Sequence, residues 1–251
     1  MTGELAGKTV LVTGGSRGIG RAIVLRLIEA GASVVVNYLR NEVAARETCE
    51  QAHARGGSAE AIPADVGDPN GVRELFARIR VRWPRLDCLV HGAAMGRLQP
   101  LLAVRPAEWN VALRTNAQAL LLLTREALGL LAEPGGRIVA LSSLGSQRYV
   151  PFYGAIGASK AALESVVRYL AVELAPRGVH VNAVSGGMID GDTLRRFPQH
   201  EVIRETIRQR TPFNRLGTAE ELADVVVFLC SDRSNLIQGQ TLVADGGFSL
   251  M

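Results

Sequence analysis

Short apolar segments recur along the chain and alternate with longer segments in which apolar residues repeat every three to four positions. The short segments are continuously apolar, which is typical of strands buried on both faces of a sheet. The longer ones are typical of amphipathic helices. Strands are predicted at Thr9–Thr13, Ser33–Asn37, Ala59–Pro63, Cys88–His91, Arg137–Ser142, His180–Val184 and Thr241–Ala244, and helices at Arg21–Ala30, Glu42–Ala54, Val72–Val81 and Ala161–Leu174.

This order of strands and helices predicts the fold class. Strand–helix repetition gives right-handed crossovers and a parallel sheet with helices on both faces. We therefore expect an α/β fold, a Rossmann-type doubly wound parallel sheet of seven strands flanked by helices. No repeat or linker interrupts the sequence, so residues 1–251 are predicted to form a single domain. Ligands of such sheets bind beyond the carboxyl ends of the strands, so the loops after each strand hold the candidate chemistry.

A glycine-rich turn follows the first predicted strand and leads into the first helix. It runs Thr13-Gly14-Gly15-Ser16-Arg17-Gly18-Ile19-Gly20. The glycines let the backbone turn tightly and approach a pyrophosphate, which sits at the positive end of the helix. A strand before and a helix after make the signal stronger than glycines alone. We expect a dinucleotide to bind here, at Gly14, Ser16, Arg17, Gly18, Ile19 and Gly20.

The residues after the second strand indicate which dinucleotide binds. Enzymes that use NAD usually carry an acid here, which accepts a hydrogen bond from the ribose 2′-hydroxyl. This chain has Leu39 and Arg40 instead. Together with Arg17, the Arg40 guanidinium could hold a 2′-phosphate, which favours NADPH; the alternative is that Arg40 is a solvated surface residue. The adenosine is expected to meet Asp65 and Val66 after the third strand, and Gly92 after the fourth.

Composition and charge narrow the classes of function only slightly. The chain is 47% hydrophobic and 21% charged, with no apolar stretch long enough to span a bilayer and no signal-peptide pattern at its start, so a cytoplasmic location is expected. The net charge of +4 favours anionic partners, but the basic residues are scattered without a nucleic-acid recognition pattern. The cysteines Cys49, Cys88 and Cys230 form no metal-ligand pattern and are expected to be buried, reduced thiols.

The glycine-rich turn is accompanied, farther along the chain, by Asp65, Asn116, Ser143, Lys160, Asn182 and Asp245-Gly246-Gly247. With these residues the sequence resembles the short-chain dehydrogenase/reductase family over nearly its full length. In that family a serine, a tyrosine and a lysine act beside the nicotinamide, and the tyrosine stands four residues before the lysine. Here that position is Ile156, and His91 also replaces a usual asparagine.

The tyrosine closest before the lysine is Tyr153, seven residues before Lys160. On a helix, residues seven apart lie two turns apart on nearly the same face, so Tyr153 is expected to project toward the side of Lys160. This Tyr-x6-Lys spacing resembles that of the NADPH-dependent bacterial enoyl-ACP reductases called type III. The resemblance is strongest in residues 142–146, 157–164, 168–174 and 181–190.

This resemblance implies NADPH-dependent reduction of the double bond of a trans-2-enoyl thioester, in fatty-acid elongation or a related acyl pathway. In such a reaction negative charge develops on the thioester oxygen, which Tyr153 is expected to stabilise by a hydrogen bond. Lys160 is expected to hold the nicotinamide ribose and to favour the tyrosinate form of Tyr153. Ser143 would steady substrate or water, and Asn116 would support a helix kink or a water near Lys160. Ile189 is expected beside the nicotinamide carboxamide.

Residues 190–215 are predicted to form a helical flap over the substrate. Between Asp192 and Arg210 the arginines exceed the acids Asp192, Glu201 and Glu205. This excess could favour an acyl carrier protein or the phosphates of coenzyme A as substrate carrier; a solvated helix is the alternative. Phe197 could line an acyl channel or simply pack in the core. The resemblance also implies a homotetramer. The flap arginines are Arg195, Arg196, Arg204, Arg208 and Arg210.

Three alternatives remain open from the sequence. The protein could be a ketoreductase acting on a 3-oxoacyl thioester or a small carbonyl compound, with a displaced tyrosine. It could also be an NADPH-binding regulatory protein that lost catalysis with Ile156. Within an enzyme, Tyr149 is a rival proton donor, although it lacks helical register with Lys160.

Overall fold

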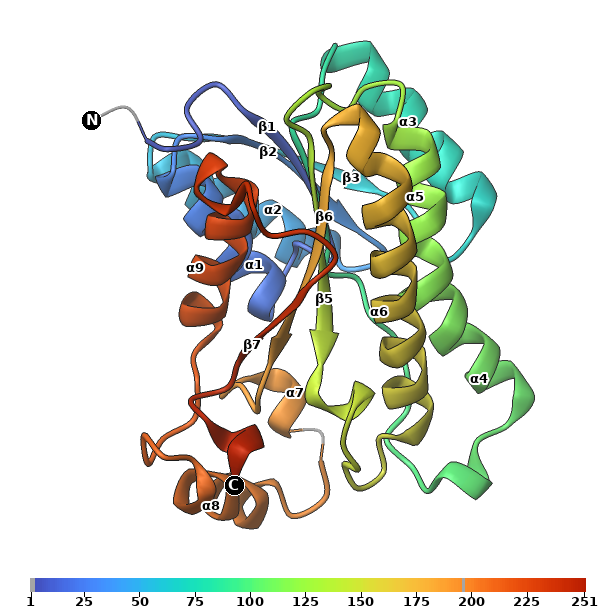
Figure 1. Ribbon diagram of the computed structural model, residues 1–251, viewed down its shortest axis with the longest axis vertical. Coiled ribbons are helices and arrows are strands. Elements are labelled where there is room, and N and C mark those ends of the chain that lie inside the picture. The colour runs from blue at the N-terminus through green and yellow to red at the C-terminus, as the bar shows by residue number, and fades with distance from the viewer. Residues whose placement is uncertain (1–2, 196) are drawn as a thin grey trace.

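The computed structural model describes residues 3–195 and 197–251, without the side chains of residues 192 and 193. Within these residues, seven strands form one parallel sheet in the order β3-β2-β1-β4-β5-β6-β7 (Figure 1). Strand order reverses between β1 and β4, so the predicted doubly wound fold is confirmed. The strands are β1 (Thr9–Thr13), β2 (Ser33–Tyr38), β3 (Ser58–Pro63), β4 (Cys88–His91), β5 (Arg137–Ser143), β6 (His180–Gly186) and β7 (Thr241–Ala244).

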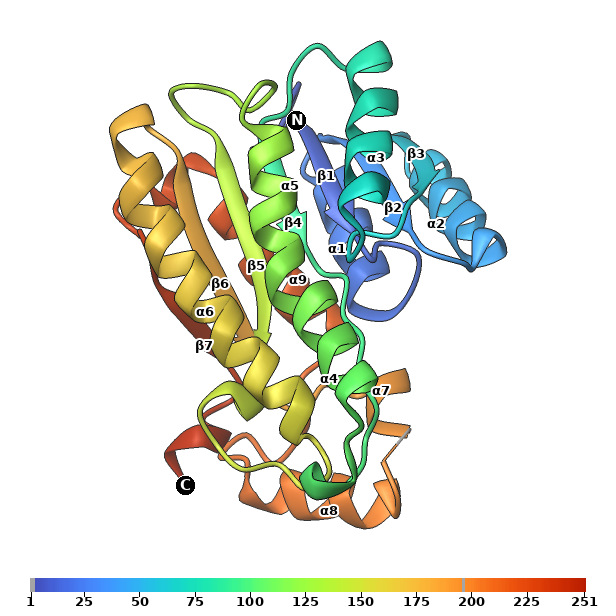
Figure 2. The same ribbon diagram turned by 90° about the vertical axis from the view of Figure 1, so that its right-hand side faces the viewer.

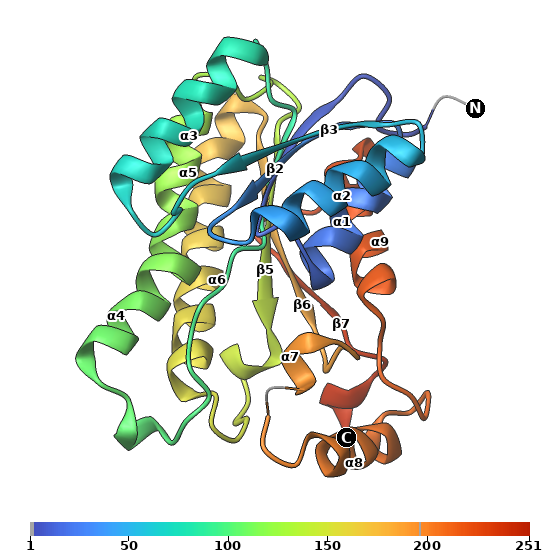
Figure 3. The same cartoon turned by 180° about the vertical axis from the view of Figure 1, so that it is seen from behind.

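Helices cover both faces of the sheet, as Figures 2 and 3 show. One layer consists of α1 (Gly18–Glu29), α2 (Glu42–Ala54) and α9 (Ala219–Cys230). The other consists of α3 (Pro69–Arg82), α4 (Pro106–Leu113), α5 (Ala119–Ala127) and α6 (Gly154–Leu174). Two short helices, α7 (Asp192–Arg195) and α8 (His200–Arg210), lie beyond the carboxyl ends of the strands (Figure 1).

The sheet separates two apolar cores because successive side chains of a strand point to opposite faces. In β1, Val10 and Val12 pack with α1 and α9, whereas Leu11 packs with α3 and α5; all three are fully buried. Burial on both faces explains why the strands are continuously apolar. The three cysteines are buried and free, as expected.

Several strands are longer than their apolar segments predict, and the additional residues matter for the site. β5 extends to Ser143 and β6 to Gly186, and these two residues pair in the sheet. A strand predicted from its apolar run ends where that run ends. In the sheet, the backbone hydrogen bonds between neighbouring strands continue for as long as N–H and C=O groups find partners. Ser143 is therefore held at the carboxyl edge of the sheet.

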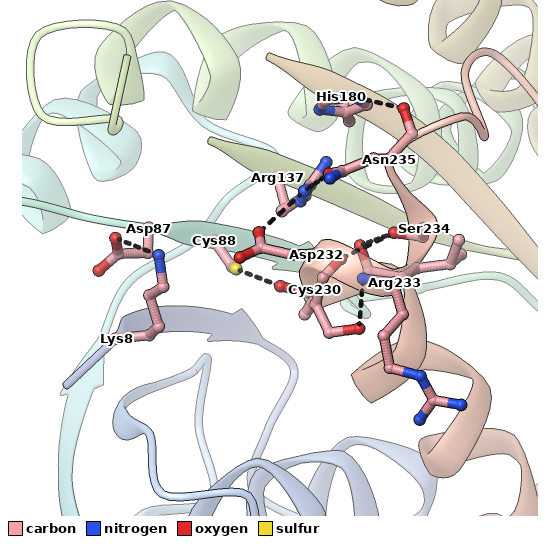
Figure 4. Close-up of polar contacts among 12 residues, drawn as sticks. Lys8, Asp87, Cys88, Arg137, His180, Cys230, Asp232, Arg233, Ser234 and Asn235 are labelled. Carbon is pink, nitrogen blue, oxygen red and sulfur yellow. Dashed lines mark hydrogen bonds and ion pairs between the residues drawn. The ribbon is translucent and has the colours of Figure 1, made fainter. Parts of the chain in front are cut away.

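The opposite edge of the sheet is held by polar contacts at the first residues of β4, β5 and β6 (Figure 4). Arg137 is 2% exposed and donates hydrogen bonds to the side chains of Asp232 and Asn235, which joins β5 to the segment after α9. The Cys88 thiol lies 3.6 Å from the carbonyl oxygen of Cys230. These contacts stabilise the edge of the sheet at which the strands begin. The candidate site residues lie at the other edge, where the strands end. In the described part of the chain, no helix has the length and hydrophobicity needed to cross a bilayer.

Candidate active site

The glycine-rich turn lies between β1 and α1, close to the loop that follows β4. Gly14 has a φ of 69°, and a Cβ added to it would lie 2.9 Å from the backbone nitrogen of Ala93. A Cβ on Gly20 would lie 2.0 Å from the carbonyl oxygen of Gly14. Two helices hold the turn in place: the carbonyl oxygen of Ser16 accepts hydrogen bonds from Arg21 of α1 and Thr48 of α2. Backbone this tightly folded at the start of a helix suits a pyrophosphate.

Arg17 and Arg40 follow the neighbouring strands β1 and β2, and both side chains are exposed. Neither guanidinium forms a hydrogen bond or an ion pair with any residue that the structure describes. They therefore keep their donors available for a phosphate on an adenosine ribose. Leu39, beside Arg40, is 40% exposed and offers an apolar surface at the same edge. These residues fit the NADPH that the sequence predicts.

Replacing both guanidinium groups in the variant Arg17→Ala/Arg40→Ala should weaken NADPH binding by about 100-fold and leave NADH binding nearly unchanged, because each hydrogen bond to a charged group contributes roughly 1.5–3 kcal/mol. Fluorescence titration of the two reduced cofactors measures both dissociation constants. Arg46→Ala is the matched control, since Arg46 is an exposed arginine of α2 that pairs with Glu42. An equal loss for NADPH and NADH would contradict a 2′-phosphate site.

The other predicted cofactor residues lie at the same edge of the sheet but differ in exposure. Asp65 is exposed and accepts a hydrogen bond from the backbone of Gly67, at 2.8 Å, whereas the Val66 side chain is buried in the core. Gly92 lies so close to β1 that an added Cβ would be 2.9 Å from the carbonyl oxygen of Thr13. Ile189 is half-buried and lines a cavity of about 180 Å³ beside β7. Val66 can therefore meet an adenine through its backbone only.

His91 connects the cofactor turn to the helical layer. It is fully buried, with Nδ1 3.0 Å from the Thr13 hydroxyl and Nε2 3.3 Å from the carbonyl oxygen of Asn116. A carbonyl oxygen can only accept, so Nε2 donates to Asn116 and Nδ1 accepts from Thr13. Burial, and then the charge of Lys160, lower the pKa of His91 to about 3, so the ring is neutral. The histidine thus performs a structural role where the family usually has asparagine.

Asn116 lies in a π-helical turn, η2 (Arg114–Gln118), between α4 and α5. Its Oδ1 accepts from the backbone N–H of Met95 at 2.7 Å, and its Nδ2 donates to the Met95 carbonyl at 2.9 Å and to the Ser159 hydroxyl at 2.8 Å. The helix is interrupted here, as expected, and π-turns often mark functional sites. Since every polar atom of the side chain is bonded within the protein, Asn116 fastens the loop after β4 to α6.

Lys160 lies on α6 and is 4% exposed. Its Nζ donates to the carbonyl oxygen of Leu141 at 2.6 Å. Burial lowers the pKa of Lys160 to about 8, and the charge of Glu164 raises it in partial compensation. The ammonium is therefore protonated at pH 7, with two more donors that could hold the hydroxyls of a nicotinamide ribose.

Tyr153 occupies the N-cap position of α6, without a capping bond from its side chain, and so does not lie within the helix as its spacing from Lys160 predicts. Its ring stacks on Phe197 with centroids 6.3 Å apart. Burial raises the pKa of Tyr153, and the nearby Ser143 side chain opposes this only in part. The expectation that Lys160 would favour the tyrosinate is therefore wrong: Tyr153 is a neutral phenol that can donate a hydrogen bond.

The position that usually carries the tyrosine is filled by apolar packing. Ile156 is 8% exposed, and a Cβ added to Gly96 would lie only 2.2 Å from its Cγ1. Ile156 therefore lies directly against the loop that follows β4 and has no group that could donate a proton. Tyr149, the rival donor, is 88% exposed and lies on the surface.

Two residues that shape the site are not among the sequence-predicted ones. A Cβ on Gly145 would lie 2.5 Å from ring carbon Cδ1 of Tyr153, so only glycine admits the ring in this position. Glu164 is a buried carboxylate one turn after Lys160. The four-residue spacing of Glu164 from Lys160 can be seen in the sequence, but only the structure shows that the carboxylate is buried.

The flap arginines are engaged within the chain. Arg204 pairs with Asp190 at 2.7 Å and Arg208 pairs with Glu205 at 2.7 Å. Arg210 lies over the ring of Phe248, and Arg195 also has an interaction partner. Arg196 and the side chain of Asp192 lie outside the described residues. The flap is helical and lies at the carboxyl edge, but its described arginines give a docking site for an acidic carrier no particular support.

Comparison with known proteins identifies the family. A family model described as "Enoyl-(Acyl carrier protein) reductase" matches residues 14–249. The 1-cyclohexenylcarbonyl-CoA reductase of Streptomyces collinus is 43% identical over 96% of this chain and 86% of its own length. The 3-oxoacyl-[acyl-carrier-protein] reductase FabG of Staphylococcus aureus is 34% identical over 96% of this chain and 97% of its own.

A solved structure agrees with both. The angucycline C-6 ketoreductase LanV, with bound NADP, superposes with a TM-score of 0.92 at 35% identity, covering 100% of this chain and 99% of that chain. The matching family model and both relatives are described as reductases, and the solved structure shares the fold. This chain therefore belongs to the short-chain dehydrogenase/reductase family of oxidoreductases.

Proposed function

We propose that this protein is an NADPH-dependent reductase of α,β-unsaturated acyl thioesters, acting on the carbon–carbon double bond. The observation that carries the proposal is that Ile156 fills the usual tyrosine position, while Tyr153, three residues earlier, lies close enough to Ser143 for that side chain to affect its pKa. In enoyl reduction hydride arrives at C3, whereas negative charge develops on the thioester oxygen, three bonds away. A donor that stabilises this oxygen belongs farther from the nicotinamide than a donor to a ketone.

The residues of the site then have separable roles. When NADPH is bound, it supplies the hydride. Arg17 and Arg40 hold its 2′-phosphate, and the Lys160 ammonium holds its nicotinamide ribose. The Tyr153 phenol donates a hydrogen bond to the thioester oxygen and stabilises the enolate, and Ser143 orients that phenol. A proton added at C2 completes the reduction.

Ketone reduction is the second candidate function, and the named relatives support it at least as well as double-bond reduction. FabG is named for a 3-oxoacyl substrate and LanV is named a ketoreductase. The Streptomyces collinus relative is named for a coenzyme A thioester with a ring double bond next to the carbonyl. In a ketoreductase, Tyr153 would have to give its proton to the oxygen of the same carbon that receives hydride.

A direct comparison of two substrates tests the proposal. Crotonyl-CoA should give a kcat/KM about tenfold or more above that of acetoacetyl-CoA, because only the enoyl substrate places its charged oxygen away from the nicotinamide. The measurement follows NADPH consumption and is repeated with NADH and with the same acyl groups on acyl carrier protein. A preference for acetoacetyl-CoA would overturn the proposal in favour of the second candidate. Tight NADPH binding with no turnover of either acyl group, on either carrier, would support the regulatory alternative.

The assembly and the setting of the enzyme are part of the same proposal. Helix α6 exposes Tyr169 and Val172, at 70% and 76% of their surface, on a face turned away from the sheet. Apolar side chains at this spacing suit a contact with another helix. We place the protein in the cytoplasm as a homotetramer that uses this face, in fatty-acid elongation or a related acyl pathway.

A further inference from the structure

Glu164 is a buried acid to which the proposed chemistry assigns no role. It is 5% exposed, and a carboxylate this deep in a protein is stable only when donors surround it. The Ser142 and Ser146 hydroxyls donate to its Oε1 at 2.5 and 2.6 Å, and the Gln147 amide donates to its Oε2 at 3.3 Å. Both oxygens of the carboxylate therefore accept hydrogen bonds, which hold it in one orientation.

All three donors come from the short segment of residues 142–147 that surrounds Ser143. This segment includes η3 (Leu144–Ser146), in which Gly145 lies against the Tyr153 ring. Ser143, between two of the donors, lies close enough to the Tyr153 hydroxyl to affect its pKa. Glu164 consequently fastens to α6 the segment that packs against the ring of the tyrosine and lies beside its hydroxyl.

The same carboxylate faces Lys160, one turn earlier on α6. Its charge raises the pKa of Lys160 and so opposes the larger effect of burial. His91, whose pKa the charge of Lys160 lowers, and Tyr153 are both neutral at pH 7, and Arg168, one turn after Glu164 on α6, is exposed. Glu164 is thus the negative charge that acts on the buried ammonium.

We propose that Glu164 is a positioning residue of the active site, whose single carboxylate fastens the Ser143 segment beneath Tyr153 and provides the negative charge facing Lys160. The inference rests on the proposed function only in treating Tyr153 and Lys160 as the working groups. It does not depend on whether a double bond or a ketone is reduced. Glu164 itself does not touch the substrate.

The variant Glu164→Gln separates the two effects, because glutamine keeps the shape of the side chain and removes its charge. Without that charge the pKa of Lys160 should fall below about 8. The alkaline limb of kcat/KM should then move to lower pH, so that activity at pH 8 drops about three- to tenfold while activity near pH 6 changes little. The assay uses whichever of crotonyl-CoA and acetoacetyl-CoA the wild-type enzyme reduces.

A direct readout without substrate is available because the chain has just two lysines, Lys8 and Lys160. Labelling lysine with ¹³C at Cε gives one NMR resonance for each, and a pH titration follows both in the cofactor-free protein. In Glu164→Gln the Lys160 resonance should titrate at lower pH than in the wild type. The Lys8 resonance should behave alike in the variant and the wild type, since the ion pair of Lys8 with Asp87 lies at the opposite edge of the sheet.

Two further variants separate charge from packing. Ser146→Ala removes one donor to the carboxylate but keeps its charge, so it should lower kcat without moving the alkaline limb. Glu173→Gln makes the same change of charge at an exposed site on α6 and should change neither kcat nor the alkaline limb. An unchanged Lys160 titration in Glu164→Gln, with the protein folded, would overturn the inference. Failure of the enoyl proposal alone would leave this titration as expected.

Discussion

Replacing Tyr153 by phenylalanine should lower kcat by about a thousandfold and leave the dissociation constant for NADPH unchanged. The change removes one hydroxyl and keeps the ring that stacks on Phe197 and fits against Gly145. The lost hydroxyl lies near Ser143 and, in the proposed reaction, donates a hydrogen bond to the substrate oxygen on which negative charge develops. Steady-state kinetics measure kcat, and quenching of NADPH fluorescence measures binding.

Tyr149→Phe is the matched control, because it removes the same hydroxyl from a side chain that is 88% exposed. Its kinetics should match those of the wild type. Ser143→Ala should reduce kcat by a smaller factor, about tenfold, since it removes the orienting partner and leaves the donor in place. Substantial turnover by Tyr153→Phe would show that another group stabilises the substrate oxygen.

Replacing Lys160 by methionine should separate activity from stability. We expect kcat/KM to fall at least about 100-fold, because the ammonium that would hold the ribose is lost. Stability at pH 7 should not fall and should rise by up to roughly 3 kcal/mol, because an apolar side chain of similar length replaces a buried charge. Urea unfolding, followed by circular dichroism, measures this difference.

The pH dependence of that gain follows from the pKa of Lys160. Its folded value of about 8 lies below its ordinary value of 10.5, so above pH 8 the unfolded chain binds more protons than the folded one. The penalty for burying the charge is therefore present below pH 8 and disappears as pH rises toward 10.5. The stability advantage of Lys160→Met should shrink over the same window. A variant that is several kcal/mol less stable at pH 7 would mean that the hydrogen bond of Lys160 with Leu141 and its attraction to the charge of Glu164 outweigh its desolvation.

The features that the sequence predicts well depend on residues that are adjacent in the chain. The glycine-rich turn depends on adjacent residues between one strand and one helix, and its consequences at Gly14 and Gly20 can be inferred from spacing alone. The strands are predictable for the same reason, because burial on both faces leaves a continuous apolar run.

The features of the site that the sequence does not predict depend on contacts between segments that are far apart in the chain. Glu164 is informative because α6 packs on the segment after β5, which places its carboxylate beside Ser142 and Ser146. The Tyr153 pKa depends on burial beneath Phe197 and on Ser143, and not on helical register with Lys160. The flap arginines look like free positive charge in the sequence, but acids such as Asp190, just before the flap helices, pair with them.

The position of β1 inside the sheet has a consequence for the order in which the protein is made. β1 leaves the ribosome before the other strands, yet its two neighbours are β2 and β4, and the Gly14 turn lies against Ala93. The cofactor turn can therefore reach its final shape only after synthesis has passed Ala93. Ser143, Tyr153 and Lys160 emerge later, so a growing chain can complete the walls of its nucleotide site before its reducing site exists.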